Sequence, residues 1–136
     1  MYTTVTIRDA TTLKRPREKQ EKRTFVLDLL SERVSVRELI RSRVYQEVQE
    51  YNAVQPEYYR GLVEPSDAER TLNGLRLRQR RQIDWEAQFE QAVDAFTRNG
   101  FLILVDDEQV TDLDAIVEVK LGTMVTFLKL VPLVGG

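Results

Sequence analysis

The chain has 136 residues and a mass of 15.9 kDa, the size of one domain with a single hydrophobic core. Apolar residues make up 42% and charged residues 31%, a composition typical of a globular protein and too apolar for a disordered one. Lys and Arg number 20 against 22 Asp and Glu, so the net charge is −2. That balance gives no overall positive field to attract nucleic acid or an anionic membrane, and we expect neither as a partner.

Two residue types are missing from the sequence. Without Cys there is no thiolate nucleophile, no zinc–thiolate cluster and no disulfide. Without His, the commonest general base and the commonest metal ligand are both lacking. Most enzyme mechanisms are therefore excluded, although carboxylate chemistry and an oxygen-ligated metal are not. The first ten residues do not resemble a signal peptide and no apolar run approaches the ~20 residues of a membrane span, so we expect a cytoplasmic protein.

The first thirty residues predict two strands. Residues 3–7 alternate β-branched apolar and polar side chains, which is typical of a strand. Residues 8–22 are rich in charge and read as a solvated connection. In residues 23–30, Phe25, Leu27 and Leu29 alternate with Val26, Asp28 and Leu30. The sequence therefore predicts a hairpin with a long loop.

A helix is predicted to follow. Ser35 is a suitable N-cap, and Glu38 three residues later completes a capping box. An apolar stripe at helical spacing predicts a face that packs on a sheet; its members are Val36, Leu39, Ile40, Val44, Val48 and Tyr51. The charged side chains are expected on the opposite side; they are Arg37, Arg41, Arg43, Glu47 and Glu50.

The region from Asn52 to Gly100 contains several turn signals. Ser66 and Glu69 form a second capping box, which predicts a short helix ending at Asn73-Gly74. A longer helix is predicted from about Gln79 to Arg98. Its apolar stripe either packs on the sheet, the reading we favour, or binds a partner groove; the stripe consists of Trp85, Phe89, Val93 and Phe96.

The last third returns to strands. Residues 101–105 form a continuous apolar run, typical of a buried strand, and residues 106–108 predict a turn. Residues 110–119 predict a short strand or loop, and residues 124–131 a final strand. Strands at both ends with helices between them indicate an α+β fold with the helices on one face of the sheet.

Two glycines, Gly135 and Gly136, follow the final strand after only four residues. Because neither has a Cβ, such an end can enter a narrow channel and place its carboxylate where a side chain would clash. Pro132 removes one backbone donor, which suits a segment that leaves the sheet without pairing. The alternative is a frayed terminus without a role.

The order of these elements, ending in Gly-Gly, resembles the β-grasp fold of ubiquitin-like proteins. Residues 101–110 are similar to the third strand and following turn of ubiquitin, residues 113–121 to the segment before its last strand, and residues 123–130 to that strand. The tail from Leu130 to Gly136 is closer to the Pro-containing ends of the sulfur-carrier proteins of molybdopterin and thiamine synthesis, and it lacks the arginines of the ubiquitin tail. The resemblance covers residues 1–52 and 101–136 and implies one domain, 1–136, with a helical insertion at about residues 53–100.

The resemblance implies a function as a protein modifier, like the ubiquitin-like proteins of bacterial operons that also encode activating, conjugating and deubiquitinase-like enzymes. The Gly136 carboxylate would be adenylated with ATP, carried as a thioester on a cysteine and joined to a target amine. The chain itself would be no enzyme and need no cofactor, because its partners would supply the catalysis: an activating enzyme, a conjugating enzyme and a deconjugating metalloprotease-like enzyme. The tail that enters the groove of the activating enzyme would be Val131, Pro132, Leu133 and Val134.

Two alternatives stay open. In a sulfur carrier, the same carboxylate would become a thiocarboxylate. In a binding module of the same fold, Gly135 and Gly136 would have no role. If chains of the modifier form, the accessible acceptors are expected in the first loop, at Lys14, Lys19 and Lys22.

Two charged clusters are candidates for binding sites. The first loop from Lys14 to Arg23 and the group Arg76, Arg78, Arg80 and Arg81 are basic, but nearby acidic residues favour solvated segments over a phosphate site. The acidic residues after the 101–105 run do not match a calcium-binding loop, which favours a solvated turn; they are Asp106, Asp107, Glu108, Asp112 and Asp114.

Overall fold

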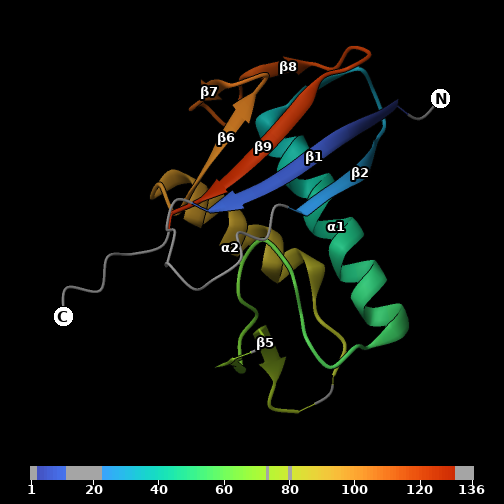
Figure 1. Ribbon diagram of the computed structural model, residues 1–136, viewed down its shortest axis with the longest axis vertical. Coiled ribbons are helices and arrows are strands. Elements are labelled where there is room, and N and C mark those ends of the chain that lie inside the picture. Colours follow the sequence, from blue (N-terminus) through green and yellow to red (C-terminus); the bar gives the residue numbers. More distant parts are fainter. Residues whose placement is uncertain (1–2, 12–22, 73, 80, 131–136) are drawn as a thin grey trace.

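The computed structural model describes residues 3–11, 23–72, 74–79 and 81–130 (Figure 1). Its main feature is a five-stranded mixed sheet with the order β2-β1-β9-β6-β7. These strands are β1 (Thr3–Thr11), β2 (Arg23–Leu29), β6 (Phe101–Val105), β7 (Glu108–Val110) and β9 (Met124–Lys129). Strands β1 and β9 run parallel at the centre, and the other neighbours are antiparallel. The predicted α+β class is confirmed.

Two helices, α1 (Val36–Val54) and α2 (Trp85–Thr97), lie on one face of this sheet, as predicted (Figure 1). The core forms where α1 meets the sheet. Its strand side chains alternate inward along each strand, and they include Val5, Ile7, Leu27, Leu29, Ile103, Val125 and Phe127. Helix α2 packs against α1 and the start of β6, where the Phe96 and Phe101 ring centroids lie 5.8 Å apart.

Strand β1 is longer than the predicted residues 3–7. It continues to Thr11 because β9 pairs alongside it from Thr6–Met124 to Thr11–Lys129. The interpretation of Arg8 to Thr11 as solvated connection was therefore wrong. One consequence is that Asp9 follows Val5 and Ile7 on the inward face, where it is buried.

Helix α1 begins as predicted, with the Ser35 side chain accepting a hydrogen bond from the Glu38 backbone amide at 3.1 Å. All six residues of the predicted apolar stripe are buried. Arg43 and Glu47, which were expected on the exposed side, are buried as well. Arg43 pairs with Asp9 and Glu47, and Glu47 also accepts a hydrogen bond from a backbone amide. These partners make the burial of both charged side chains possible.

Short strands complete the upper end of the molecule in Figure 1. The segment predicted as a short strand or loop contains β8 (Ile116–Glu118), which pairs with β3 (Arg33–Ser35) just before α1. Asp106 and Asp107 turn the chain between β6 and β7 with positive φ angles of 48° and 70°. Asp side chains tolerate this left-handed region better than most residues, so the predicted turn is confirmed.

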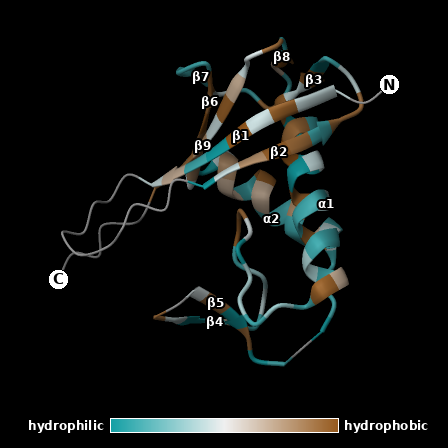
Figure 2. Ribbon diagram, turned by 45° about the vertical axis from the view of Figure 1, so that its right-hand side comes forward, coloured by the Kyte–Doolittle hydropathy of each residue, from teal (hydrophilic) through white to brown (hydrophobic). Residues whose placement is uncertain are grey.

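The short helix predicted from Ser66 to Gly74 was wrong. Residues Ala68–Thr71 (β4) and Gly74–Leu77 (β5) form an antiparallel hairpin instead (Figure 2). Gly74 has a φ of 133°, which a helix does not allow. The Ser66 hydroxyl accepts a hydrogen bond from Arg81 at 3.1 Å, so the Ser-Glu spacing was not a helix start.

Helix α2 begins six residues later than the predicted Gln79. Asp84 is its N-cap and accepts a hydrogen bond from the Glu86 amide. Just before it, both side-chain amide atoms of Asn52 bind the backbone of Ile83, with an Ile83 N to Asn52 Oδ1 distance of 2.8 Å and an Asn52 Nδ2 to Ile83 O distance of 3.0 Å. The fully buried face of α2 is formed by Gln88, Ala92 and Phe96, with Trp85, Phe89 and Val93 partly buried. The prediction that this stripe packs in the core is confirmed for Phe96, which contacts Phe101 of β6, and in part for Trp85 and Phe89, which pack against the core while partly exposed.

Neither helix in the described part of the chain has the length and apolar character needed to cross a bilayer.

Candidate functional site

The residues predicted to carry the function lie outside the described residues. This holds for the tail of Val131, Pro132, Leu133, Val134, Gly135 and Gly136 and for the acceptors Lys14, Lys19 and Lys22. The described residues next to the tail are Lys129 and Leu130, which we call the tail root. The Leu130 amide donates to the Gly100 carbonyl at 3.1 Å, so the root is attached to the start of β6.

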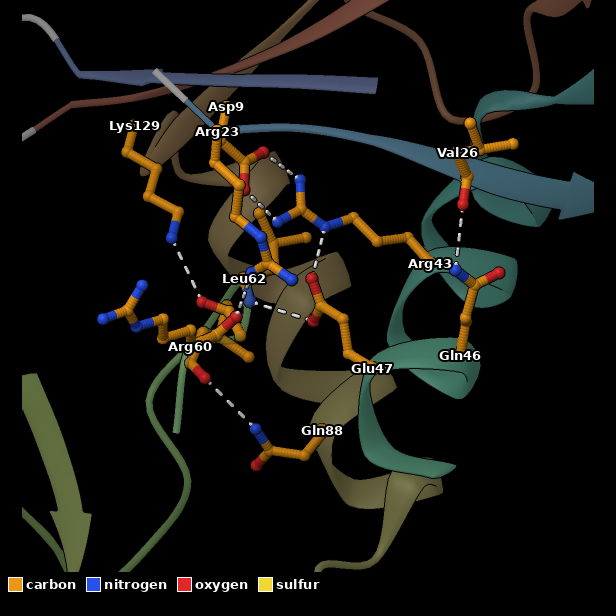
Figure 3. Close-up of polar contacts among 12 residues, drawn as sticks. Asp9, Arg23, Val26, Arg43, Gln46, Glu47, Arg60, Leu62, Gln88 and Lys129 are labelled. Atoms are coloured by element: carbon orange, nitrogen blue, oxygen red, sulfur yellow. Dashed lines mark hydrogen bonds and ion pairs between the residues drawn. The ribbon is translucent and has the colours of Figure 1, made fainter. Parts of the chain in front are cut away.

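The tail root is also tied to a loop far away in the sequence, residues 60–63. Each of the four residues of this loop uses one backbone group to bind a side chain, and the four side chains come from four different elements (Figure 3). Arg23 donates to the Arg60 carbonyl at 2.9 Å, and Lys129 donates to the Gly61 carbonyl at 3.1 Å. Glu47 accepts from the Leu62 amide at 3.0 Å, and Gln88 donates to the Val63 carbonyl at 3.2 Å. The loop is therefore fixed to β2, β9, α1 and α2 together.

A buried ion network supports this loop from the core side. The Arg43 guanidinium donates to both oxygens of Asp9, at 2.5 and 2.7 Å, and to Glu47 at 2.6 Å (Figure 3). Its charge also lies 4.4 Å from the Phe127 ring centroid. One arginine thus joins β1 and α1, and through Glu47 it reaches the loop 60–63. Buried charges paired in this way are costly to disturb.

The network and its burial shift the pKa of Arg43 and that of the neighbouring Lys129 in opposite directions. Burial alone disfavours a charged Arg43, but Glu47 and Asp9 outweigh it and raise the pKa of Arg43 above its ordinary value. Burial, together with the nearby Arg43 charge, lowers the pKa of Lys129. Lys129 is hydrogen-bonded and only partly exposed, which makes it a poorer acceptor for modification than the exposed Lys120.

Gly61 is the position of the loop that tolerates no side chain. A Cβ there would lie 2.1 Å from the hydroxyl of Tyr59. Tyr59 is itself buried, and its backbone amide donates to the Leu75 carbonyl at 2.8 Å. The segment before the loop is therefore joined to the hairpin β4–β5. Burial raises the pKa of the Tyr59 phenol well above its ordinary value.

A groove of about 560 Å³ opens between the tail root and the hairpin β4–β5. Its size falls within the ~300–1,000 Å³ of ligand-binding pockets. Its walls come from four parts of the chain: the loop with Gly61, Leu62, Val63 and Glu64; the hairpin with Arg70, Thr71, Gly74 and Leu75; the end of α2 and start of β6 with Ala95, Gly100 and Phe101; and the tail root. We call this the tail-root groove.

The described members of the two charged clusters are largely engaged with neighbours. Arg76 pairs with Glu69 at 2.6 Å, and Arg81 donates to Ser66. In the acidic stretch, Asp106 accepts from the Met124 amide and Asp112 from the Asp114 amide. Within residues 3–11, 23–72, 74–79 and 81–130, no group of three or more acidic side chains is arranged to hold a metal ion. For these residues the contacts agree with the interpretation as solvated, structural segments, whereas residues 14–22 of the first loop and Arg80 lie outside the described residues.

Sequence reasoning missed the ion network, although a signal for part of it exists. Arg43 and Glu47 are four residues apart and fall on the same helical stripe as Ile40, Val44 and Tyr51. A charged pair within an apolar stripe indicates a buried ion pair. The loop 60–63 offers no comparable signal, because its bonds use backbone groups that every residue carries.

Comparison with protein-family models, with curated proteins and with solved structures finds no match for this chain.

Proposed function

We propose that the chain is a ubiquitin-like β-grasp domain that acts as a protein modifier through its C-terminal glycines. The observation that carries the proposal is the position of β9. This strand lies at the centre of the sheet, parallel to β1 and antiparallel to β6, and it leads directly into the tail. The N-terminal hairpin, the helix α1 across one face and this central last strand are the arrangement that the resemblance to ubiquitin-like proteins calls for.

The tail root is hydrogen-bonded to two other parts of the chain, and this supports the proposal. Hydrogen bonds to Gly100 and Gly61 fix the last described residues of the strand. Gly136 follows Leu130 by six residues, which span at most about 20 Å when extended. A fixed root and a short, slender end present a carboxylate to the active site of another enzyme at small entropic cost.

The proposed reaction takes place on the partners. The Gly136 carboxylate attacks the α-phosphate of ATP, which forms an acyl-adenylate and releases pyrophosphate. A cysteine thiolate of the activating enzyme then displaces AMP to give a thioester, which passes to a conjugating enzyme. A target amine finally displaces the thiol to form an amide, which a metalloprotease-like enzyme would hydrolyse. Gly135 keeps the approach open, and Val131 to Val134 bind the partner as an extended strand.

The proposal requires a free Gly136 carboxylate in the mature protein, whether encoded or exposed by proteolysis. A sulfur carrier has the same requirement and differs in its acceptor, because sulfide replaces one carboxylate oxygen. The third possibility is a binding module of the same fold, for which Gly136 has no role.

Intact mass spectrometry separates the three functions. The protein is expressed with the neighbouring genes of its own genome and supplied with ATP, as wild type and with Gly136 deleted. We expect heavier species that resist reductant and require Gly136. A gain of about 16 Da on the free protein, one oxygen replaced by sulfur, would identify a carrier. Identical spectra for the two proteins would favour the binding module.

A further inference from the structure

The tail-root groove lies beside the one part of the molecule that the proposed function must bring into an active site. Lys129 and Leu130 form part of its wall, and the opposite wall is the hairpin β4–β5. Both walls are fixed in place. The hairpin is held through the Tyr59 amide to Leu75, and the loop 60–63 through its four side-chain contacts. The groove is therefore a built feature of the fold.

The length of the tail brings any enzyme that acts on it close to this groove. Because Gly136 lies at most about 20 Å from Leu130, the surface around its active site must cover the region of the tail root. The hairpin stands next to that region, so an enzyme that holds the tail meets the hairpin and the groove at the same time.

The groove has the chemistry of a pocket for apolar side chains. Its floor and walls include Leu62, Val63, Leu75, Ala95 and Phe101. One ion pair, Arg70 with Glu64, lies at the exposed rim, with an Arg70 Nε to Glu64 Oε1 distance of 2.7 Å. An apolar centre with a polar rim is the pattern of an interface in which one buried side chain contributes most of the affinity.

We infer that the tail-root groove is a docking surface for the enzyme that activates the tail, and that it receives an apolar side chain of that enzyme while the Gly136 carboxylate reaches the active site. This inference rests on the proposed function and adds a recognition element to it. The central segment between α1 and β6 thereby determines which activating enzyme can use the tail. A partner with no apolar side chain at this place would bind the tail alone, and weakly.

The test uses pyrophosphate exchange, because acyl-adenylate formation is reversible and returns labelled pyrophosphate to ATP. A dialysed extract of host cells, free of amino acids that would drive other adenylating enzymes, is supplied with ATP, labelled pyrophosphate and the purified protein. Exchange is measured against protein concentration for the wild type and for the variant without Gly136. The latter reports the proposed function alone.

Two pairs of variants then test the groove. Leu75→Asp places a charge in the groove, whereas Leu72→Asp makes the same change on the same hairpin at a fully exposed position, 106% accessible. Ala95→Glu changes the helical wall, and Ala87→Glu is its match at an exposed position of α2. Fluorescence of Trp85, the single tryptophan, checks that each variant is folded.

We expect Leu75→Asp and Ala95→Glu to raise the half-saturating protein concentration about tenfold, in line with the loss of one interface hot spot, with the maximal exchange rate unchanged. Leu72→Asp and Ala87→Glu should match the wild type. Unchanged half-saturation in both groove variants would overturn the docking surface and leave the proposed function standing. A lower half-saturating concentration would also overturn it, because it would mean that the groove holds the protein's own tail. Absence of any exchange that requires Gly136 would overturn the proposed function, and this inference with it.

Discussion

Two regions of the molecule are stabilised in different ways. The sheet with α1 is held by apolar side chains that alternate along strands and recur along one helix face. The central segment, residues 55–100, has a smaller apolar share, and it is positioned by side chains of the first region that bind its backbone, as at the loop 60–63 and Ile83. The first kind of stabilisation depends on residue type at regular spacing. The second depends on single hydrogen bonds between groups that are far apart in the sequence.

Arg43 lies in the first region and reaches the loop 60–63 of the central segment through Glu47, so its replacement should have the largest effect on stability. Arg43→Ala leaves the carboxylates of Asp9 and Glu47 buried without their partner, and we expect a loss of about 3–5 kcal/mol in the free energy of unfolding. Urea unfolding followed by Trp85 fluorescence measures it. Arg37→Ala is the control on the same helix, because Arg37 is half-exposed and pairs with exposed Asp114. A loss below about 1 kcal/mol, the range of a surface pair, would contradict the role of the network.

Replacing Asn52 should destabilise the central segment more than the sheet with α1. Asn52→Ala removes both hydrogen bonds to Ile83, and we expect a cost of about 1–3 kcal/mol. Because these bonds hold the segment before α2, hydrogen exchange should increase most in residues 81–97 and least in β1 and β9. Gln49→Ala, an exposed amide on the same helix, should change neither. Equal increases in all elements would mean that the two regions unfold as one unit.

Replacing Tyr59 should have the smallest effect on the free energy of unfolding, and the size of this effect should depend on pH. The pKa of Tyr59 is raised in the folded protein, so above about pH 10, the ordinary pKa of tyrosine, the unfolded chain loses a proton that the folded chain keeps. The unfolded state then binds fewer protons, and stability must fall as the pH rises. Tyr59→Phe removes the hydroxyl that is hydrogen-bonded with the Gln88 side chain, which costs about 0.5–1.5 kcal/mol at neutral pH. Its unfolding free energy should approach that of the wild type from pH 10 to 11.5. A constant difference over that range would show that Tyr59 is not responsible.

The sequence alone predicted the regular parts of this protein. Alternation predicted β2 and β9, and the Ser35–Glu38 pair with its apolar stripe predicted α1, because the period of buried residues follows directly from strand and helix geometry. A continuous apolar run predicted β6, since a strand buried on both faces has no polar side. It also singled out Gly135 and Gly136, which stays a prediction.

The tertiary structure alone decided the rest. Strands β4 and β5, between Ala68 and Leu77, form a hairpin where a helix was predicted, and Tyr59 pairs with Leu75 across a separation that no local spacing reveals. Asp9 and Arg43 meet across 34 positions, and Lys129 reaches Gly61 across 68. Such contacts carry no periodic signal, because each is a single polar group whose partner is set by the packing of distant elements. The tail-root groove has the same origin, since its walls are four segments that only the folded chain brings together.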